Sequence, residues 1–216
     1  MNQGVIITLP KSDDVTEYLS VFSKPIIDEC SKQNIKLKKL EKDKANRSDF
    51  EKLLKSIDYK MIIFNGHGSV NEILGHKNKE LISAGKNDSL LTNRITYSRS
   101  CYSLQGVGNS SMKNNTDGCF IGYKIPFMFL IDLTHVTNPS KDNIAKIFFE
   151  TSNLIPITII KGNSVKEAHD NSRKSMLRAI KSAIKKKNKD SEAIAETLWN
   201  NYLAQGLVGN FNATLR

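Results

Sequence analysis

The sequence predicts an α/β fold in which a mostly parallel central sheet is flanked by helices. Short apolar runs rich in β-branched residues alternate with segments of helical periodicity along most of the chain. Such alternation is typical of a parallel sheet covered by helices. A length of 216 residues suits one well-buried domain, so we expect residues 1–216 to form a single domain.

The expected strands are short runs of apolar residues, at 5–8, 35–40, 61–64, 95–97, 119–123 and 155–160. The run at 35–40 alternates apolar residues with lysines, which is typical of an edge strand. The run at 61–64 is continuously apolar, as in a strand that is buried on both faces. We also expect a small hairpin arm at 70–74.

Helices are expected where apolar residues recur with helical spacing, at 15–30, 48–54, 79–84 and 141–150 and in two further helices that begin near 164 and 190. Pro25 predicts a kink or break in the first helix. Ser48 and Ser164 each begin an S-x-x-E capping box. Residues 106–118 are rich in Gly, Ser and Asn, which predicts a flexible loop without regular structure.

The net charge of +10 comes mainly from a lysine- and arginine-rich segment at 161–190. Apolar residues recur there at helical spacing, so the cations are expected on the solvated face of a helix. The segment lacks the interleaved aromatic residues that stack on bases. We therefore expect no nucleic acid as a direct ligand, and an acidic partner is the alternative use of this surface.

The compartment and cofactor expectations come from what the sequence lacks. No apolar run approaches the roughly 20 residues of a membrane span, and the N-terminal residues do not resemble a signal peptide. We therefore expect a cytoplasmic protein with no membrane partner. Cys30, Cys101 and Cys119 are odd in number and irregularly spaced, which predicts neither a disulfide framework nor a zinc site. No metal or other cofactor is expected.

A histidine and a cysteine, each placed just after a strand-like run, are the strongest functional signal. His67 follows the run at 59–64, and Cys101 follows the run at 95–97, 34 residues later. Ligands and catalytic groups collect at the carboxyl ends of strands in α/β sheets. A thiolate nucleophile needs a base, and imidazole is the usual one. The two residues are therefore predicted to form a His–Cys dyad on adjacent strands.

The local sequence separates these two residues from the other histidines and cysteines. His67 lies between Gly66 and Gly68, which allow a sharp turn of the backbone beside a ligand. Cys30 and Cys119 lie within apolar patterns and are expected to be buried, as free cysteines usually are. Cys101 instead follows its apolar run and is flanked by polar residues. Partial exposure beside a cationic group predicts a lowered thiol pKa.

The motifs NGHGS and SRSCYS resemble those of caspase-fold (clan CD) cysteine peptidases, a group that includes caspases, metacaspases, clostripain-like and gingipain-like enzymes and bacterial CHAT domains. CFIGY is similar to the strand after the catalytic loop, and PITIIKGNSVKEAHDNS to the last core strand and its helix. The resemblance covers most of residues 5–207. It implies a caspase-like three-layer sandwich and a thiol protease that hydrolyses peptide bonds in protein substrates.

The resemblance also implies roles for individual residues. His67 matches the base and Cys101 the nucleophile, while the backbone N–H groups of Gly68 and Cys101 match the oxyanion hole. No third member of a triad is evident. Arg99 stands where metacaspases carry an acidic residue that binds a basic P1 side chain, which favours an acidic or neutral P1 residue.

Asp13 and Asp14 lie near where other members of the group place a specificity residue, and these two carboxylates favour the opposite P1 preference. The resemblance further implies an activating regulatory protein and a role as a bacterial defence or cell-death effector. Two alternative functions stay open. One is a catalytically silent caspase-like binding module, and the other is a protein that binds nucleic acid or an acidic partner through its basic surface.

Overall fold

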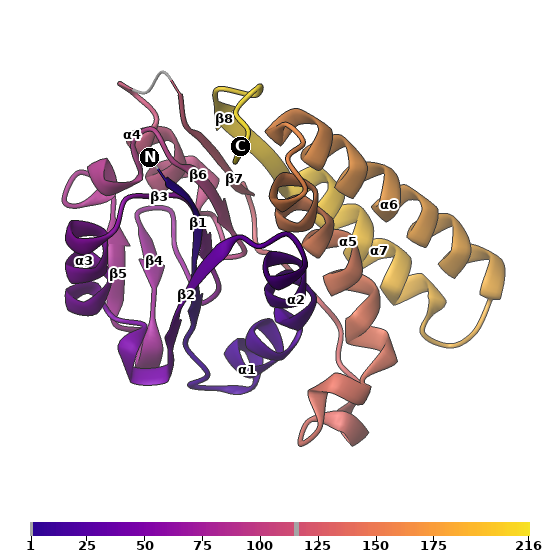
Figure 1. The fold of residues 1–216 in the computed structure, drawn as a ribbon. Helices are drawn as coiled ribbons and strands as arrows, with labels where there is room; N and C mark the ends of the chain where they lie inside the picture. Colours follow the sequence, from indigo (N-terminus) through magenta and orange to yellow (C-terminus); the bar gives the residue numbers. More distant parts are fainter. Residues whose placement is uncertain (1, 115–116) are drawn as a thin grey trace.

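The computed structural model describes residues 2–114 and 117–216. Its main sheet has six strands in the order β2-β1-β3-β6-β7-β8 (Figure 1). The strands span Asn2–Leu9 (β1), Lys36–Glu41 (β2), Tyr59–Phe64 (β3), Ile95–Ser98 (β6), Cys119–Tyr123 (β7) and Gln205–Gly209 (β8). The first five are parallel, and β8 pairs antiparallel with β7. This architecture confirms the expected α/β class with a mostly parallel sheet, and β2 is an edge strand as predicted.

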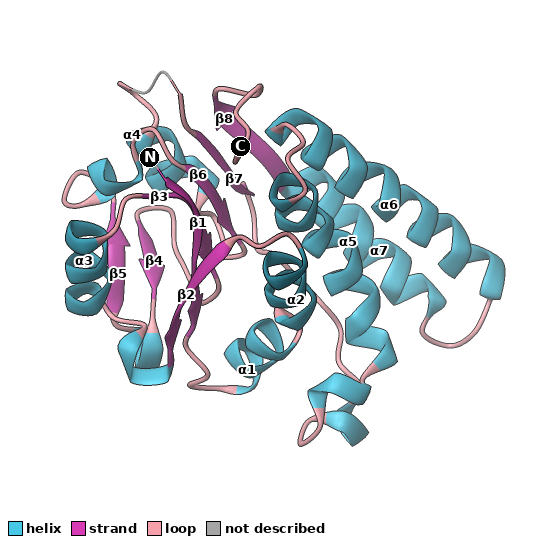
Figure 2. Ribbon diagram, viewed as in Figure 1, coloured by secondary structure: helices cyan, strands magenta, loops and turns pink. Residues whose placement is uncertain are grey.

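Helices cover both faces of the sheet (Figure 2). They are α1 (Asp14–Val21), α2 (Lys24–Lys32), α3 (Arg47–Ser56), α4 (Asn109–Ser111), α5 (Asn143–Ile160), α6 (Val165–Lys186) and α7 (Ser191–Ala204). Alternate residues of β1 point to opposite faces, so Val5 and Ile7 pack in the cluster with α1, α2 and α5, while Ile6 packs in the cluster with α3. Helices α6 and α7 form a further apolar cluster with α5.

The predicted break in the first helix is present, because α1 ends at Val21 and α2 begins at Lys24, with Pro25 in its first turn. A proline is tolerated there because the first helical N–H groups have no partner within the helix. The capping box that begins at Ser164 is also confirmed. By contrast, the cap of α3 is Asn46, whose side chain accepts from the Asp49 N–H, and not Ser48.

Two predicted elements are wrong in type. Residues 155–160 belong to helix α5, and the run was mistaken for a strand because this part of the helix is apolar on nearly every side. A short apolar run without a polar face cannot be assigned by periodicity alone. Residues 79–84, expected as a helix, contain strand β5 (Glu80–Ser83), which pairs with β4 (Glu72–Leu74) in the expected hairpin arm.

The expected loop at 106–118 is largely helical in its first part. Residues Leu104–Gly108 form a π-helical turn that leads into α4, and Val107 is fully buried. The Val107 N–H donates to the Val70 carbonyl at 3.1 Å, which fixes this segment to the loop before the hairpin. The sequence pattern did not predict this helical segment, because most of its residues are small and polar. Its few apolar side chains all point inward. Residues 115–116 of the predicted loop lie outside the described residues.

Gly106→Ala tests whether this segment is a packed element. A Cβ at Gly106 would lie 2.1 Å from the Val70 carbonyl oxygen, so we expect the substitution to lower the free energy of unfolding by about 1–3 kcal/mol. Urea unfolding measures the change, and Ser110→Ala in α4 serves as the control. Equal midpoints for the two variants would show that the segment is not packed as described.

Candidate active site

The pairing of β3 with β6 brings the loops of His67 and Cys101 together. Phe64 pairs with Ser98 at the end of the two strands, and His67 and Cys101 each follow three residues later in the chain. The two loops touch, because a Cβ at Gly68 would lie 3.1 Å from the Cys101 carbonyl oxygen. The structure therefore brings together the two loops from which a dyad was predicted.

The turn that presents His67 depends on Gly66 and on the β4–β5 hairpin. Gly66 has a φ of +152°, and a Cβ there would lie 2.3 Å from the Leu74 carbonyl oxygen. The His67 carbonyl in turn accepts a hydrogen bond from the Leu74 N–H at 3.0 Å. Only glycine fits this close approach with this backbone conformation. The hairpin thus holds the backbone on both sides of the His67 side chain.

Asp13 is the hydrogen-bonding partner of His67. The Asp13 Oδ2 atom lies 2.9 Å from His67 Nε2, and both side chains are about one-third exposed. If the neutral ring donates its Nε2 proton to this carboxylate, Nδ1 is the nitrogen left with a lone pair. Asp13 therefore selects the tautomer whose Nδ1 can accept a proton, which is the role of an orienting third residue.

The position of Asp13 follows from its role as the N-cap of α1. Its Oδ1 atom accepts from the Thr16 N–H at 2.9 Å. Burial by itself would raise the pKa of Asp13, but the hydrogen bonds from Thr16 and His67 outweigh it and lower the pKa. The carboxylate is therefore ionised at neutral pH. Asp13 was expected near a specificity position and was not connected with His67, because their contact depends on β1 lying beside β3.

Cys101 is partly buried beside the segment that follows β7. Burial raises the pKa of its thiol, and a hydrogen bond from the Phe127 backbone N–H only partly offsets this. The lowered pKa predicted from neighbouring Arg99 is therefore wrong in direction. Tyr102, directly after the cysteine, has a φ of +58°, a conformation that costs energy for a large residue and that often marks functional turns.

Two backbone N–H groups on the adjoining loops are candidate oxyanion donors, and one of them, that of Cys101, hydrogen-bonds to its own thiol. Within residues 2–114 and 117–216, neither the Gly68 N–H nor the Cys101 N–H donates to another residue. N–H donors on adjoining loops that are not bonded to other residues are what an oxyanion hole requires. Their availability is consistent with the predicted roles of these two residues, which stay predictions.

The structure separates the three residues predicted to bind substrate. Asp13 contacts His67, and Asp14 is an exposed residue in the first turn of α1. Arg99 is only 1% exposed, and its side chain points into the interior. A buried guanidinium does not line a surface pocket, so the structure offers no contact between Arg99 and a P1 side chain.

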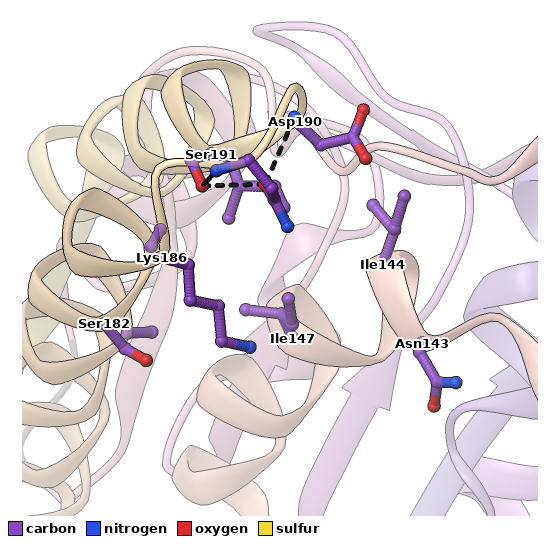
Figure 3. Close-up of a pocket in the computed structure, with 11 residues that line it drawn as sticks. Asn143, Ile144, Ile147, Ser182, Lys186, Asp190 and Ser191 are labelled. Carbon is purple, nitrogen blue, oxygen red and sulfur yellow. Dashed lines mark hydrogen bonds between the residues drawn. The ribbon is translucent and has the colours of Figure 1, made fainter.

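Metal sites, membrane-spanning helices and surface hollows are the other features that bear on function. No group of three or more His, Cys, Asp or Glu side chains in the described residues is placed to hold a metal ion, and no described helix has the length and apolar character needed to span a membrane. A hollow of about 310 Å³ lies between α5, α6 and α7, with Ile144, Ile147 and Lys186 among its lining residues (Figure 3). None of its lining residues comes from the His67 or Cys101 loops.

The fold of this chain is similar to that of two solved cysteine proteinase structures. The chain is similar to the crystal structure of the Arg-specific cysteine proteinase gingipain R, with a TM-score of 0.59 and 11% identity over 99% of this chain and 48% of that one. It is equally similar to RgpB in the complex of the Porphyromonas gingivalis pro- and mature domains, with a TM-score of 0.59 and 8% identity over the same shares.

The likeness is one of fold alone, and this chain spans about half the length of those proteins. No family model matches the sequence. No curated protein matches it either.

Asp13→Asn tests the orienting role of Asp13. Asparagine preserves the helix cap but can donate to Nε2, which would favour the tautomer that carries its proton on Nδ1. We expect alkylation of Cys101 by iodoacetamide at neutral pH to slow about tenfold, the effect of one unit in the apparent thiol pKa. Site-resolved mass spectrometry gives the rate, with Asp14→Asn as the control for lost charge. Equal rates in both variants would remove Asp13 from the site.

Proposed function

We propose that this protein is a cysteine endopeptidase that cleaves protein substrates through an acyl-enzyme at Cys101. The observation that carries the proposal is the juxtaposition of the Asp13-bound His67 loop with the Cys101 loop at the carboxyl end of the sheet. The likeness to cysteine proteinases in fold supports it. A nucleophile, a base and an orienting acid are the parts that acyl transfer requires.

The proposed reaction begins with a neutral thiol, because burial raises the pKa of Cys101. His67 removes the thiol proton as the sulfur attacks the scissile carbonyl carbon. The resulting oxyanion accepts hydrogen bonds from the Gly68 and Cys101 N–H groups, each worth roughly 3–4 kcal/mol in such sites. His67 then protonates the departing amine, and water hydrolyses the thioester with His67 again acting as the base.

Asp13 supports this cycle through His67. Its carboxylate is ionised at neutral pH and faces the ring nitrogen that does not take part in proton transfer. It therefore stabilises the imidazolium that forms when His67 takes the thiol proton. Arg99 was expected to set the P1 preference, but its side chain is buried. The proposal therefore assigns no residue to that role.

An activating regulatory protein and an effector role in bacterial defence or cell death stay predictions that follow from the resemblance. The alternative is a catalytically silent binding module with the same fold. Labelling of the Cys101 thiol distinguishes it from a protease. The lysines of α6, among them Lys174, Lys181 and Lys185, are exposed as expected. Binding of an acidic partner to them stays a prediction.

A peptide chloromethyl ketone or acyloxymethyl ketone tests the nucleophile. We expect such a probe to label Cys101 and to spare Cys30 and Cys119, whose burial raises their pKa to about 12. Intact-mass and peptide mass spectrometry locate the adduct. Labelling that is unchanged in Cys101→Ala would contradict the assignment.

His67→Ala tests the base through the pH dependence of the same labelling. The folded thiol pKa lies above its ordinary value of 9.0, so without the base little thiolate forms at neutral pH. We expect labelling of His67→Ala to be strongly reduced at pH 7 and to recover as the pH rises above 9.0. A variant that retains the parent's rate at pH 7 would show that His67 does not activate the thiol. His135→Ala is the control, because this histidine lies outside the site and is as exposed as His67.

A further inference from the structure

A buried arginine lies beneath the candidate dyad. Arg99 is two residues before Cys101, and its side chain extends from the end of β6 into the space between the sheet and the helices. The guanidinium carbon lies 5.4 Å from the centre of the Phe149 ring on α5. Burial lowers the pKa of Arg99. Removing a charged group from water is costly unless the protein replaces its hydrogen bonds.

The replacement hydrogen bonds go to four acceptors, which lie on the loop after β3, on α5, at the N-cap of α2 and on α1. Nε donates to Asn65 Oδ1 at 2.8 Å, and Nη1 donates to Asn153 Oδ1 on α5 at 3.0 Å. Nη2 donates to Ser23 Oγ at 2.7 Å and to the Leu19 carbonyl at 3.3 Å. All four acceptors are neutral, and no carboxylate among the described residues pairs with Arg99. A planar fork of donors can satisfy such a divergent set, and a single ammonium cannot.

Asn65 carries the connection to the histidine loop. It lies two residues before His67, as Arg99 lies two residues before Cys101. Its backbone N–H donates to Thr8 Oγ1 at 3.0 Å, and its amide nitrogen donates to the Thr8 carbonyl at 2.8 Å. The same nitrogen lies 3.2 Å from Ser23 Oγ. Asn65 is therefore fixed to β1 on one side and to Arg99 on the other.

This connection begins where the paired strands end. The register of β3 with β6 ends at Phe64 and Ser98, and the Arg99 N–H donates to the Phe64 carbonyl at 3.0 Å. One residue further along each chain, the side chains of Asn65 and Arg99 bond to one another. They continue the link between the two strands past the last paired residues and toward the two loops.

We propose that Arg99 is a positioning residue that holds the His67 and Cys101 loops in a fixed relation, a role that rests on the proposed function. It touches no substrate and acts through the two loops. Apolar side chains could fill this part of the interior without the free-energy cost of burying a charge. Packing alone therefore does not explain an arginine at this position. The multiple donors of Arg99 instead join both loop origins to α1, α2 and α5, so that the thiol and the imidazole keep one relative geometry.

A double-mutant cycle on the full chain tests this role. Iodoacetamide alkylation of Cys101 is followed by mass spectrometry from pH 6 to pH 9 in the parent, His67→Ala, Arg99→Lys and the double variant. We expect each single substitution to slow alkylation at pH 7 about tenfold, which corresponds to one unit in the apparent thiol pKa. The double variant should be no slower than His67→Ala, because residues that act through one another are not additive.

The outcomes separate this inference from the proposed function. Equal rates in the parent and in His67→Ala would remove the dyad itself. Suppose that alkylation of the parent depends on His67 and that folded Arg99→Lys keeps the parent's rate and pH profile. This result would contradict the positioning role of Arg99 but leave the dyad in place. A double variant slowed by the product of the two single effects would also contradict it, because the two residues would then act independently.

A gentler variant covers the case in which Arg99→Lys does not fold. Ser23→Ala removes the 2.7 Å acceptor of Nη2 with little change in volume. Ser20→Ala is the matched control, because Ser20 donates to a helix carbonyl and has no contact with the guanidinium. We expect only Ser23→Ala to slow Cys101 alkylation at pH 7. Equal alkylation rates in the two serine variants would contradict the positioning role.

Discussion

The parallel register of β3 and β6 is the constraint on which the candidate site depends. Strands in a parallel pair end at the same edge of the sheet, so residues equally far beyond Phe64 and Ser98 must lie near one another. His67 and Cys101 satisfy this condition. A shift of one residue in the register would place the histidine beside a different part of the cysteine loop. The contact of Gly68 with the Cys101 backbone shows how little space the arrangement leaves.

The polar interactions around this edge keep the register fixed. Asp13 reaches His67 from the N-cap of α1, while Asn65 and Arg99 bond to one another directly beyond the paired strands. Polar groups in an interior are tolerated when their hydrogen bonds are satisfied, and they then favour one arrangement over its neighbours. The candidate site therefore combines an apolar sheet, which supplies the stability, with a small polar network, which sets the geometry.

The sequence predicted the fold class and the two loops because these follow from local signals. Strand-like runs, the glycines beside His67 and the polar flanks of Cys101 can all be recognised within a few residues. The bond of Asp13 to His67 could not, since it depends on β1 lying next to β3. Arg99 was expected to bind substrate because of its position in the resemblance to metacaspases, and its burial was not foreseen because its neutral partners lie up to 80 residues away. Residues 155–160 were misassigned because this stretch of α5 is apolar on nearly every side and so has no polar face.

Identification of cleavage products tests the central claim most directly. A denatured proteome digest is incubated with the parent protein or with Cys101→Ser, and new peptide N-termini are identified by mass spectrometry. We expect new N-termini with the parent and none with the serine variant, because the reaction requires the thiol. The same new N-termini with both proteins, or none with a parent whose Cys101 accepts a peptide electrophile, would contradict the assignment as an endopeptidase.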